Sequence, residues 1–550
     1  MFSPLIRFWG SGWLLWGVLS VNAVAQQPDP AIQLRQEMQR EQRQESLRTM
    51  PSRTVPPDVP ALNATPDTVP EPEPVLFSPT IAVQDNGLLE QDKLQSLLAP
   101  YRQLDLGPQR IALLLRQLNA QLVTQGQVTS KARIRHIDPP TRHLDIELMP
   151  GRIGAYTHDG EPVKADLQRA FPGQEQDLLV LQDIEQGVQQ IQRLRRYQAE
   201  LRILPGQTPE LSQIDIHLTE TRPWWFQLSA DNLGSRSTGR ERVRATLNLD
   251  NTLGLLESVG LTYLRSRDSE AAVATLAIPS GYSTWSAVYA ASRYRQELLG
   301  DFEEKGGSYT GTLAWNRVLH LSAAGRDAIE LSLTYGDTWR KIERFTLTPA
   351  RLTVLKANLT HLRQGNGWRA WAQIGASHGL PWFGATDDPD GLPSAAAHAR
   401  FTQVEAHAGL IFNIPPLGGH YVGQIDAQAS RVGLYGTEQF RLVGMNAVRG
   451  YDEGTITGDS GLLFRHEWQV TPLPIKALDA QIAPLVFFDH GTTRLIDGPR
   501  IRLAGAGTGF RLVSESGRWS SDLLLAKAVD HNTVIRDNDW RAYFTFRIDL

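Results

Sequence analysis

The chain has 550 residues, a formal net charge of −4, 41% apolar residues and no cysteine. This length is too great for one ordinary domain, and the apolar fraction is too low for a bundle of membrane helices. The charge gives no case for a nucleic-acid partner, and the lack of cysteine excludes disulfides, thiolate metal sites and cysteine nucleophiles.

Residues 1–25 are predicted to be a secretory signal peptide. Arg7 precedes a mostly apolar run over residues 8–21, and Ala23-Val24-Ala25 supplies a small-x-small cleavage site. The alternative is an uncleaved membrane anchor, for which this apolar run is short. The mature chain is therefore expected to begin at Gln26.

Residues 26–50 are predicted to form a polar helix. Gln, Glu and Arg dominate residues 31–48, and the few apolar residues there form no broad stripe. A helix of this kind has no core to join, so it is either loose in water or lodged in a polar channel. The proline-rich residues 51–74 are predicted to be an extended linker that lets the helix move.

Two consecutive units with the same element order are predicted over residues 75–150 and 151–221. In each unit a strand is followed by two helices with apolar faces and then by two strands. The helical faces are carried by residues 94, 97, 98, 111, 114, 115, 118 and 122 in the first unit and by residues 184, 188, 191 and 194 in the second. The alternative is one α+β domain of unrelated halves, but the repeat favours two units.

Residues 222–550 are predicted to form a β-barrel, because apolar and polar residues alternate in segment after segment. With a strand and its share of turn taking roughly 20 residues, about 16 antiparallel strands close around an aqueous lumen. Together with the secretory leader, this indicates a bacterial outer membrane. Trp224, Trp225 and Phe226 stand where the barrel begins, and they are expected either to anchor at the inner lipid interface or to pack against the second unit.

Several motifs resemble those of a known family. Residues 444–467 read GMNAVRGYDEGTITGDSGLLFRHE and contain Val448-Arg449-Gly450-Tyr451. A later strand carries Phe487-Phe488-Asp489-His490-Gly491, and residues 121–153 and 170–187 resemble POTRA domains. In this order, the motifs resemble the outer-membrane transporters of two-partner secretion, the haemolysin- and haemagglutinin-exporting branch of the Omp85 superfamily.

This resemblance implies a transmembrane β-barrel of about 16 antiparallel strands over residues 222–550. It also implies two periplasmic POTRA domains, 75–150 and 151–221, and an N-terminal plug helix, 26–50. The first motif would lie at the tip of a long loop folded back into the lumen, and the second would lie on the inner barrel wall. The residues concerned are Val448, Arg449, Gly450 and Tyr451 at the tip, Phe487, Asp489 and Gly491 on the wall, and the supporting residues Gly458, Asp459, Gly461 and Glu467.

Arg449 is the residue expected to matter most. Its guanidinium stays charged and presents a planar fork that fits a carboxylate at two points. Paired with Asp489 on the wall, it would hold the loop at a fixed depth. We expect this pair to be hydrated, with a contribution of no more than about 1 kcal/mol. The alternative is a solvated surface arginine beside an unrelated turn.

The resemblance implies a translocator that recognises an unfolded exoprotein through its POTRA domains and exports it through the barrel. The partner would be an adhesin, haemolysin or contact-dependent toxin with an N-terminal secretion domain. Other expected partners are outer-membrane lipid and, during biogenesis, the barrel assembly machinery; the barrel is expected to be monomeric. No catalysis, cofactor, metal or nucleic-acid partner is predicted.

Three other functions fit the sequence less well. An Omp85-type insertase would be expected to have more POTRA units, and a diffusion porin would need none. A hydrolase would require that Gly375-Ala376-Ser377-His378-Gly379 form a strand-to-helix elbow, yet this segment ends an alternating strand. The glycine-rich residues 505–509 lack the βαβ unit of a nucleotide site and are expected to clear space inside the barrel.

Overall fold

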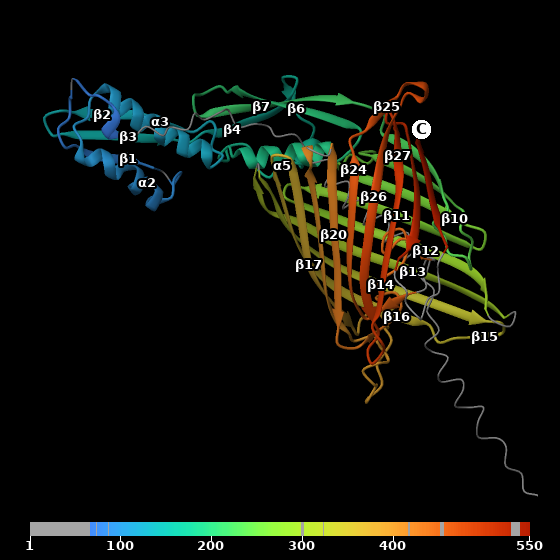
Figure 1. The fold of residues 1–550 in the computed structure, drawn as a ribbon. Coiled ribbons are helices and arrows are strands. Elements are labelled where there is room, and N and C mark those ends of the chain that lie inside the picture. Colours follow the sequence, from blue (N-terminus) through green and yellow to red (C-terminus); the bar gives the residue numbers. More distant parts are fainter. Residues whose placement is uncertain are drawn as a thin grey trace, which may run out of the picture.

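The computed structural model describes residues 66–550 except 73, 86, 299–301, 323, 416–417, 452–455 and 530–538. The predicted signal peptide, the polar helix over 26–50 and the linker up to residue 65 lie outside the described residues. In the described part the chain forms two α+β units followed by a closed barrel (Figure 1). None of the helices described there has the length and apolarity needed to cross a membrane.

The first unit is a three-stranded sheet covered by helices. Its sheet order is β1-β3-β2, with β1 parallel to β3 and β2 antiparallel to it. Its elements are β1 (Thr80–Gln84), α2 (Gln91–Leu98), η3 (Ala99–Gln103), α3 (Pro108–Thr124), β2 (Lys131–Asp138) and β3 (His143–Met149). Leu114, Leu118 and Leu122 of α3 are fully buried against the sheet residues Leu144 and Ile146, as the helical spacing predicted.

The second unit repeats this order and ends at the barrel. Its sheet order is β5-β4-β7-β6, with β4 parallel to β7 and β6 antiparallel to it. Its elements are β4 (Arg152–His158), β5 (Glu161–Pro162), α4 (Ala165–Gln168), α5 (Leu181–Gln192), β6 (Tyr197–Pro205) and β7 (Leu211–Glu220). The predicted sequence of a strand, two helices and two strands is therefore confirmed in both units.

The barrel closes when the last strand pairs with the first. Residues 545–549 of β29 run antiparallel to residues 227–231 of β8. Within the described residues the wall consists of sixteen long strands, supplemented by the short β15 (Phe345–Thr346) and β25 (Leu473–Ile475). The long strands are β8 (Trp224–Asp231), β9 (Arg242–Asp250), β10 (Ser258–Arg265), β11 (Ser269–Ser280), β12 (Ser283–Glu297), β13 (Glu303–Ser322), β14 (Gly325–Ile342), β16 (Ala350–Gly365), β17 (Trp368–Leu380), β19 (Thr402–Asn413), β20 (Gly419–Ser430), β24 (Ser460–Val470), β26 (Ala480–Arg494), β27 (Ile501–Ser514), β28 (Trp519–Ala528) and β29 (Arg541–Asp549). The predicted strand count is confirmed.

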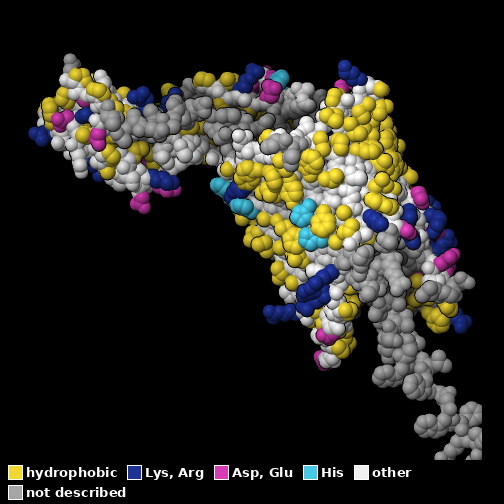
Figure 2. Space-filling model, in the orientation of Figure 1, with side chains coloured by type: hydrophobic (Ala, Val, Ile, Leu, Met, Phe, Trp, Pro, Cys, Tyr) yellow, Lys and Arg dark blue, Asp and Glu magenta, His cyan; other side chains and the backbone are white. Residues whose placement is uncertain are grey.

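Alternating side chains separate an apolar outer face from the lumen. On β26, Phe487 and Asp489 are buried inside while Val486 and Phe488 are exposed outside, as the sequence phase predicted. Figure 2 shows hydrophobic side chains over much of the visible barrel wall. Charged pairs such as Arg265 with Glu270 lie at the strand ends away from the α+β units.

The aromatic residues at the start of β8 differ in their surroundings. Trp224 is exposed, beneath the guanidinium of Arg222. Trp225 instead packs under Arg195 of the second unit, whose guanidinium carbon lies 3.9 Å from the ring centroid. The strand that opens the barrel therefore faces its surroundings with one ring and the second unit with the next.

The second unit is joined to the barrel through two strand-connecting turns. Leu256, in the turn between β9 and β10, is fully buried in the hydrophobic core of the second unit. In the turn between β11 and β12, the carbonyl of Gly281 accepts hydrogen bonds from the side chains of Gln186 and Gln190 on α5, at 3.1 and 3.0 Å. These contacts fix which end of the barrel lies beside the α+β units, as Figure 1 shows.

Candidate functional site

The site lies where the loop between β20 and β24 turns back against the inner barrel wall. Both legs of the loop pair with each other through the short strands β22 (Phe440–Arg441) and β23 (Thr457–Gly458). Beyond them Leu442 and Val448 are fully buried in a cluster with Leu463 and Leu503 of the wall. This apolar cluster positions the tip, residues 443–451, inside the barrel.

Arg449 at the loop tip binds the wall at several points. Its Nε and Nη2 donate to the two carboxylate oxygens of Asp489, at 2.6 and 2.8 Å, in the two-point geometry that the sequence suggested. Its backbone N–H also points to Asp489, at 3.2 Å, and its Nη1 donates to Glu467 at 3.0 Å. The guanidinium carbon lies 3.5 Å from the ring centroid of Phe487, a cation–π contact.

The expectation of a hydrated ion pair was wrong. Arg449 is 1% exposed and Asp489 is 0% exposed. The expectation assumed that the lumen is open water at this depth. The ring of Phe487 and the apolar cluster around Val448 instead screen the ion pair from water. Desolvation of both charges is therefore offset by several directed hydrogen bonds, and loss of either partner would leave a buried charge under-compensated.

Glu467 connects the loop tip to a second arginine. Besides Arg449, it receives Nη2 of Arg511 at 3.0 Å and the amide of Gln469 at 2.6 Å. Arg465 approaches Asp489 from the same strand as Glu467, at 3.6 Å. Arg511 also lies 3.5 Å from Asp522, so three arginines share three carboxylates on the wall.

The loop tip lies so close to the barrel wall that both the tip and the wall have glycine at the contact. Gly450 has φ of +101°, and a Cβ there would lie 2.7 Å from the carbonyl carbon of Lys527 on β28. A Cβ at Gly505 on β27 would lie 1.9 Å from the carbonyl oxygen of Arg449. Gly505 therefore makes room for the loop tip, in line with the expectation that residues 505–509 clear space inside the barrel, whereas Gly507 and Gly509 lie close to Leu525 and Leu523 of the neighbouring strand.

The remaining predicted motif residues lie at the base of the loop. Asp459, 1% exposed, accepts the N–H groups of Leu434 and Ile496, both at 2.8 Å, and so ties the end of the loop to its beginning and to the connection between β26 and β27. Gly461 packs against the ring of Phe440. Two further glycines make close contacts: Gly458 with Thr493 and Gly491 with Leu442.

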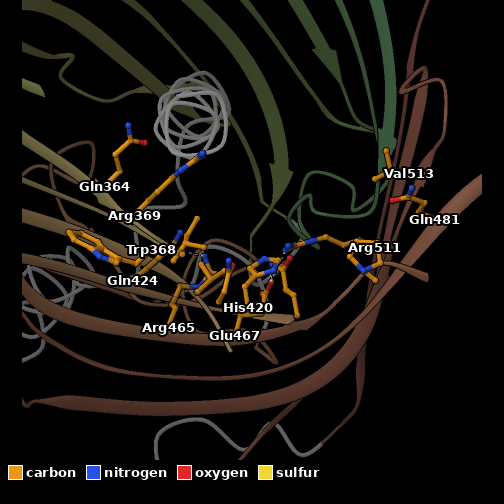
Figure 3. Close-up of a pocket in the computed structure, with 18 of the residues that line it drawn as sticks. Gln364, Trp368, Arg369, His420, Gln424, Arg465, Glu467, Gln481, Arg511 and Val513 are labelled. Carbon is orange, nitrogen blue, oxygen red and sulfur yellow. Dashed lines mark hydrogen bonds and ion pairs between the residues drawn. The ribbon is translucent and has the colours of Figure 1, made fainter. Parts of the chain in front are cut away.

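A cavity of about 650 Å³ lies next to the ion-pair network (Figure 3). Its lining runs from the turn at Gly367, near the end that carries the α+β units, to Arg449 and Glu467. The lining mixes apolar side chains with polar ones, among them Gln364, Gln424 and Arg511. Glu467 and Arg511 point toward each other in this view. The ion pair at the loop tip is thus buried on one side and borders this cavity on the other.

The sequence did not indicate a role for three residues of the site, although the alternating pattern placed them on the lumen face. Arg465 lies within the stretch 444–467 but was given no role there, and Arg511 and Tyr543 belong to no predicted motif. Tyr543 binds the loop backbone, its hydroxyl lying 2.9 Å from the N–H of Gly450. The alternation of side chains along each strand shows that these residues face the lumen. It does not show which lumen residues the loop contacts.

The hydrolase-like segment has no elbow geometry. Ser377 is buried within β17, and the residues that follow it up to Phe401 contain no helix. The strand-to-helix turn required by that motif is therefore not formed here.

A closed sixteen-strand barrel, two βααββ units before it and a loop held inside the lumen define an outer-membrane transporter of the Omp85 class. The model of one family, described as haemolysin secretion/activation protein ShlB/FhaC/HecB, matches residues 210–512. The chain belongs to this family. POTRA domain models match residues 79–151, in the ShlB-type form, and 152–205.

Relatives and a solved structure agree with this assignment. The outer membrane transporter CdiB of Dickeya dadantii is 28% identical over 403 residues, which cover 70% of this chain and 71% of the relative. The hemolysin transporter protein HpmB of Proteus mirabilis is 25% identical, with 79% and 78% covered. The fold matches the structure of CdiB from Escherichia coli with a TM-score of 0.84 at 24% identity, covering 94% of this chain and 98% of that one.

The chain is thus a two-partner secretion translocator of the outer membrane, with its POTRA domains in the periplasm. The α+β units are the POTRA domains, and the barrel end beside them faces the periplasm. The cavity therefore extends from the periplasmic side of the lumen to the loop tip.

Proposed function

We propose that this translocator exports one large unfolded exoprotein and that the loop tip with Arg449 is the latch that moves during export. The supporting observation is the contact of Arg449 with Asp489 and Glu467 beside a cavity that other charged and amide side chains also line. A latch made of hydrogen bonds and charges can open, because water entering from the cavity restores the hydration that burial removed.

The POTRA domains are the proposed docking site for the exoprotein. Strands β2 and β6 each have a neighbour on one side only, so their outer edges offer backbone groups to an additional strand. On β2, Lys131 and Arg133 are exposed, and Ile134 is 39% exposed. Backbone hydrogen bonds would supply affinity, and contacts with such side chains would supply specificity. By analogy with relatives named as haemolysin transporters, the exoprotein is of the adhesin, haemolysin or contact-dependent toxin type.

The transport step needs no chemistry from this chain. No residue of the chain is given a catalytic role, and folding of the exoprotein at the cell surface drives export. Residues 26–50 are proposed as a plug helix, supported by their polar composition on all sides. Deletion of these residues should then increase the conductance of the barrel in planar bilayers. The barrel is further proposed to be monomeric, to lie in outer-membrane lipid and to contact the barrel assembly machinery during its biogenesis.

Replacement of Arg449 by Ala tests the latch. Exoprotein release should fall at least tenfold, because the loop no longer holds a defined position and obstructs the path. Release is measured in the culture medium beside the amount of folded barrel in the outer membrane. The matched control is Arg293→Ala, since Arg293 is 78% exposed in its side chain and far along the wall from the loop.

Undiminished release from an intact Arg449→Ala barrel would refute the latch. The insertase alternative predicts a different phenotype: depletion of the chain would remove many outer-membrane proteins, whereas a dedicated translocator affects one exoprotein.

A further inference from the structure

The last strand of the barrel carries a tyrosine whose side chain hydrogen-bonds to the backbone of the loop tip. The hydroxyl of Tyr543 accepts the N–H of Gly450 at 2.9 Å and donates to the carbonyl oxygen of Tyr451 at 3.3 Å. One hydroxyl therefore serves as both acceptor and donor for two successive residues of the loop. Tyr543 is 5% exposed, so water does not readily replace these contacts.

Packing fixes the position of this hydroxyl. The ring of Tyr543 lies in a buried cluster with Leu485, Phe487, Leu524 and Ala526. Phe487 in the same cluster also carries the guanidinium of Arg449 on its face. The apolar cluster thus supports both the contact with the arginine side chain and the contact with the loop backbone.

The two contacts hold the tip from different strands. Asp489 is on β26, whereas Tyr543 is on β29, three strand-to-strand steps away, or about 14 Å along the wall. Between them the peptide at Gly450 lies close to Lys527 on β28, and the hydroxyl of Tyr451 donates to the carbonyl of Ala504 on β27 at 2.9 Å. A single anchor would leave the tip free to turn about it, whereas two separated anchors fix both depth and orientation.

We propose that Tyr543 is a positioning residue of the translocator: its hydroxyl holds the peptide units of Gly450 and Tyr451 and fixes the inward position of the loop independently of the Arg449 side chain. This inference rests on the proposed function in one respect: the anchor matters for export only because the loop is proposed to move during export. Tyr543 is a second anchor, which acts on the backbone and therefore requires no particular side chain at the tip.

A cysteine reporter measures the loop position directly. The chain contains no cysteine, so Ala447→Cys introduces a unique thiol within the tip, at a residue that is 2% exposed. The labelling rate of this thiol by a water-soluble maleimide, in full-length protein purified in detergent, reports how often the loop leaves the wall. Tyr543→Phe is then added, which removes the hydroxyl and keeps the ring in its cluster.

Tyr543→Phe should increase the labelling rate about fivefold to tenfold, the factor expected for loss of one buried hydrogen-bonding group. Tyr294→Phe is the matched control. Tyr294 is on β12, and its hydroxyl donates to Glu304 at 2.9 Å, away from the loop. This control should leave the labelling rate of the introduced thiol unchanged.

An unchanged labelling rate in Tyr543→Phe overturns the inference, as does an equal increase in Tyr294→Phe. If Tyr543→Phe gives too little folded barrel, Arg541→Gln replaces it, since Arg541 Nε donates to the carbonyl of Gly450 at 3.2 Å from the same strand. Faster labelling with normal exoprotein release would support Tyr543 as an anchor and count against loop displacement as a step of export. The two proposals therefore fail by different measurements.

Discussion

Two connections between barrel strands each bury a side chain in another part of the molecule. The periplasmic turn at 251–257 places Leu256 in the core of the second POTRA domain, and the loop at 443–451 places Arg449 against the inner wall. Both segments use a left-handed backbone, with φ of +55° at Leu256 and +101° at Gly450. They differ in what surrounds the buried side chain.

Leu256 is surrounded by apolar residues of the POTRA core, including Ile184 and Ile191. Exposing this side chain to water costs free energy that no new interaction offsets, so the contact is expected to stay closed. Arg449 is held by carboxylates and backbone groups beside a cavity of about 650 Å³. Its groups recover hydration when they leave the wall. The comparison supports the proposal that the loop contact is the one that opens, whereas the POTRA–barrel joint is expected to stay closed.

The largest stability effect is expected at the polar contact. Asp489→Asn removes the charge that receives the Arg449 fork, and breaking a buried pair from one side costs about 3–5 kcal/mol. The urea midpoint of the protein in lipid vesicles should fall accordingly. Asp337→Asn is the matched control, because Asp337 pairs with the half-exposed Arg351 at 3.0 Å and such pairs contribute about 1 kcal/mol or less. Equal shifts in the two variants would contradict the buried latch.

The next effect is expected at the apolar joint. Leu256→Ala leaves a cavity in the POTRA core and should cost about 3 kcal/mol, seen as a lower melting temperature of the second POTRA domain and faster proteolysis at its junction with the barrel. Leu253, in the same turn, is 68% exposed. Leu253→Ala should therefore change neither measurement, and a comparable loss there would show that the turn itself, not the buried leucine, makes the joint.

The smallest effect concerns a charge at the same joint. Asp183 on α5 accepts a hydrogen bond from the hydroxyl of Tyr282 in the turn between β11 and β12. Burial raises the pKa of Asp183, an effect that nearby Asp177 adds to and the hydrogen bond from Tyr282 partly opposes. The folded protein therefore binds this proton more readily than the unfolded chain, and the contribution of Asp183 to stability declines as pH rises from 3.8 through the raised pKa.

Asp183→Asn keeps an oxygen that accepts from Tyr282 but carries no charge. At neutral pH the variant should be as stable as the parent or slightly more stable, and the difference should vanish at acidic pH. Thermal unfolding at a series of pH values measures this. A variant that is less stable at neutral pH would show that the ionised carboxylate strengthens the joint.

The sequence by itself determined the architecture, because each part has its own periodicity. Helical spacing at Ile111, Leu114 and Leu118 and the repeated element order predicted both POTRA domains. The period of two fixed which residues face the lumen, as at Phe487 and Asp489. These are local properties of a helix or a strand and do not depend on distant contacts.

The tertiary structure alone decided which lumen residues meet and how much water reaches them. The motifs suggested Arg449 and Asp489, but only the folded loop shows that Glu467 also binds Arg449, that Tyr543 holds the backbone, and that the ion pair is buried. Leu256 likewise was an ordinary turn residue in the sequence, and only the fold encloses it in the POTRA core. Burial and partner choice result from segments brought together across the chain, and periodicity carries no information about such contacts.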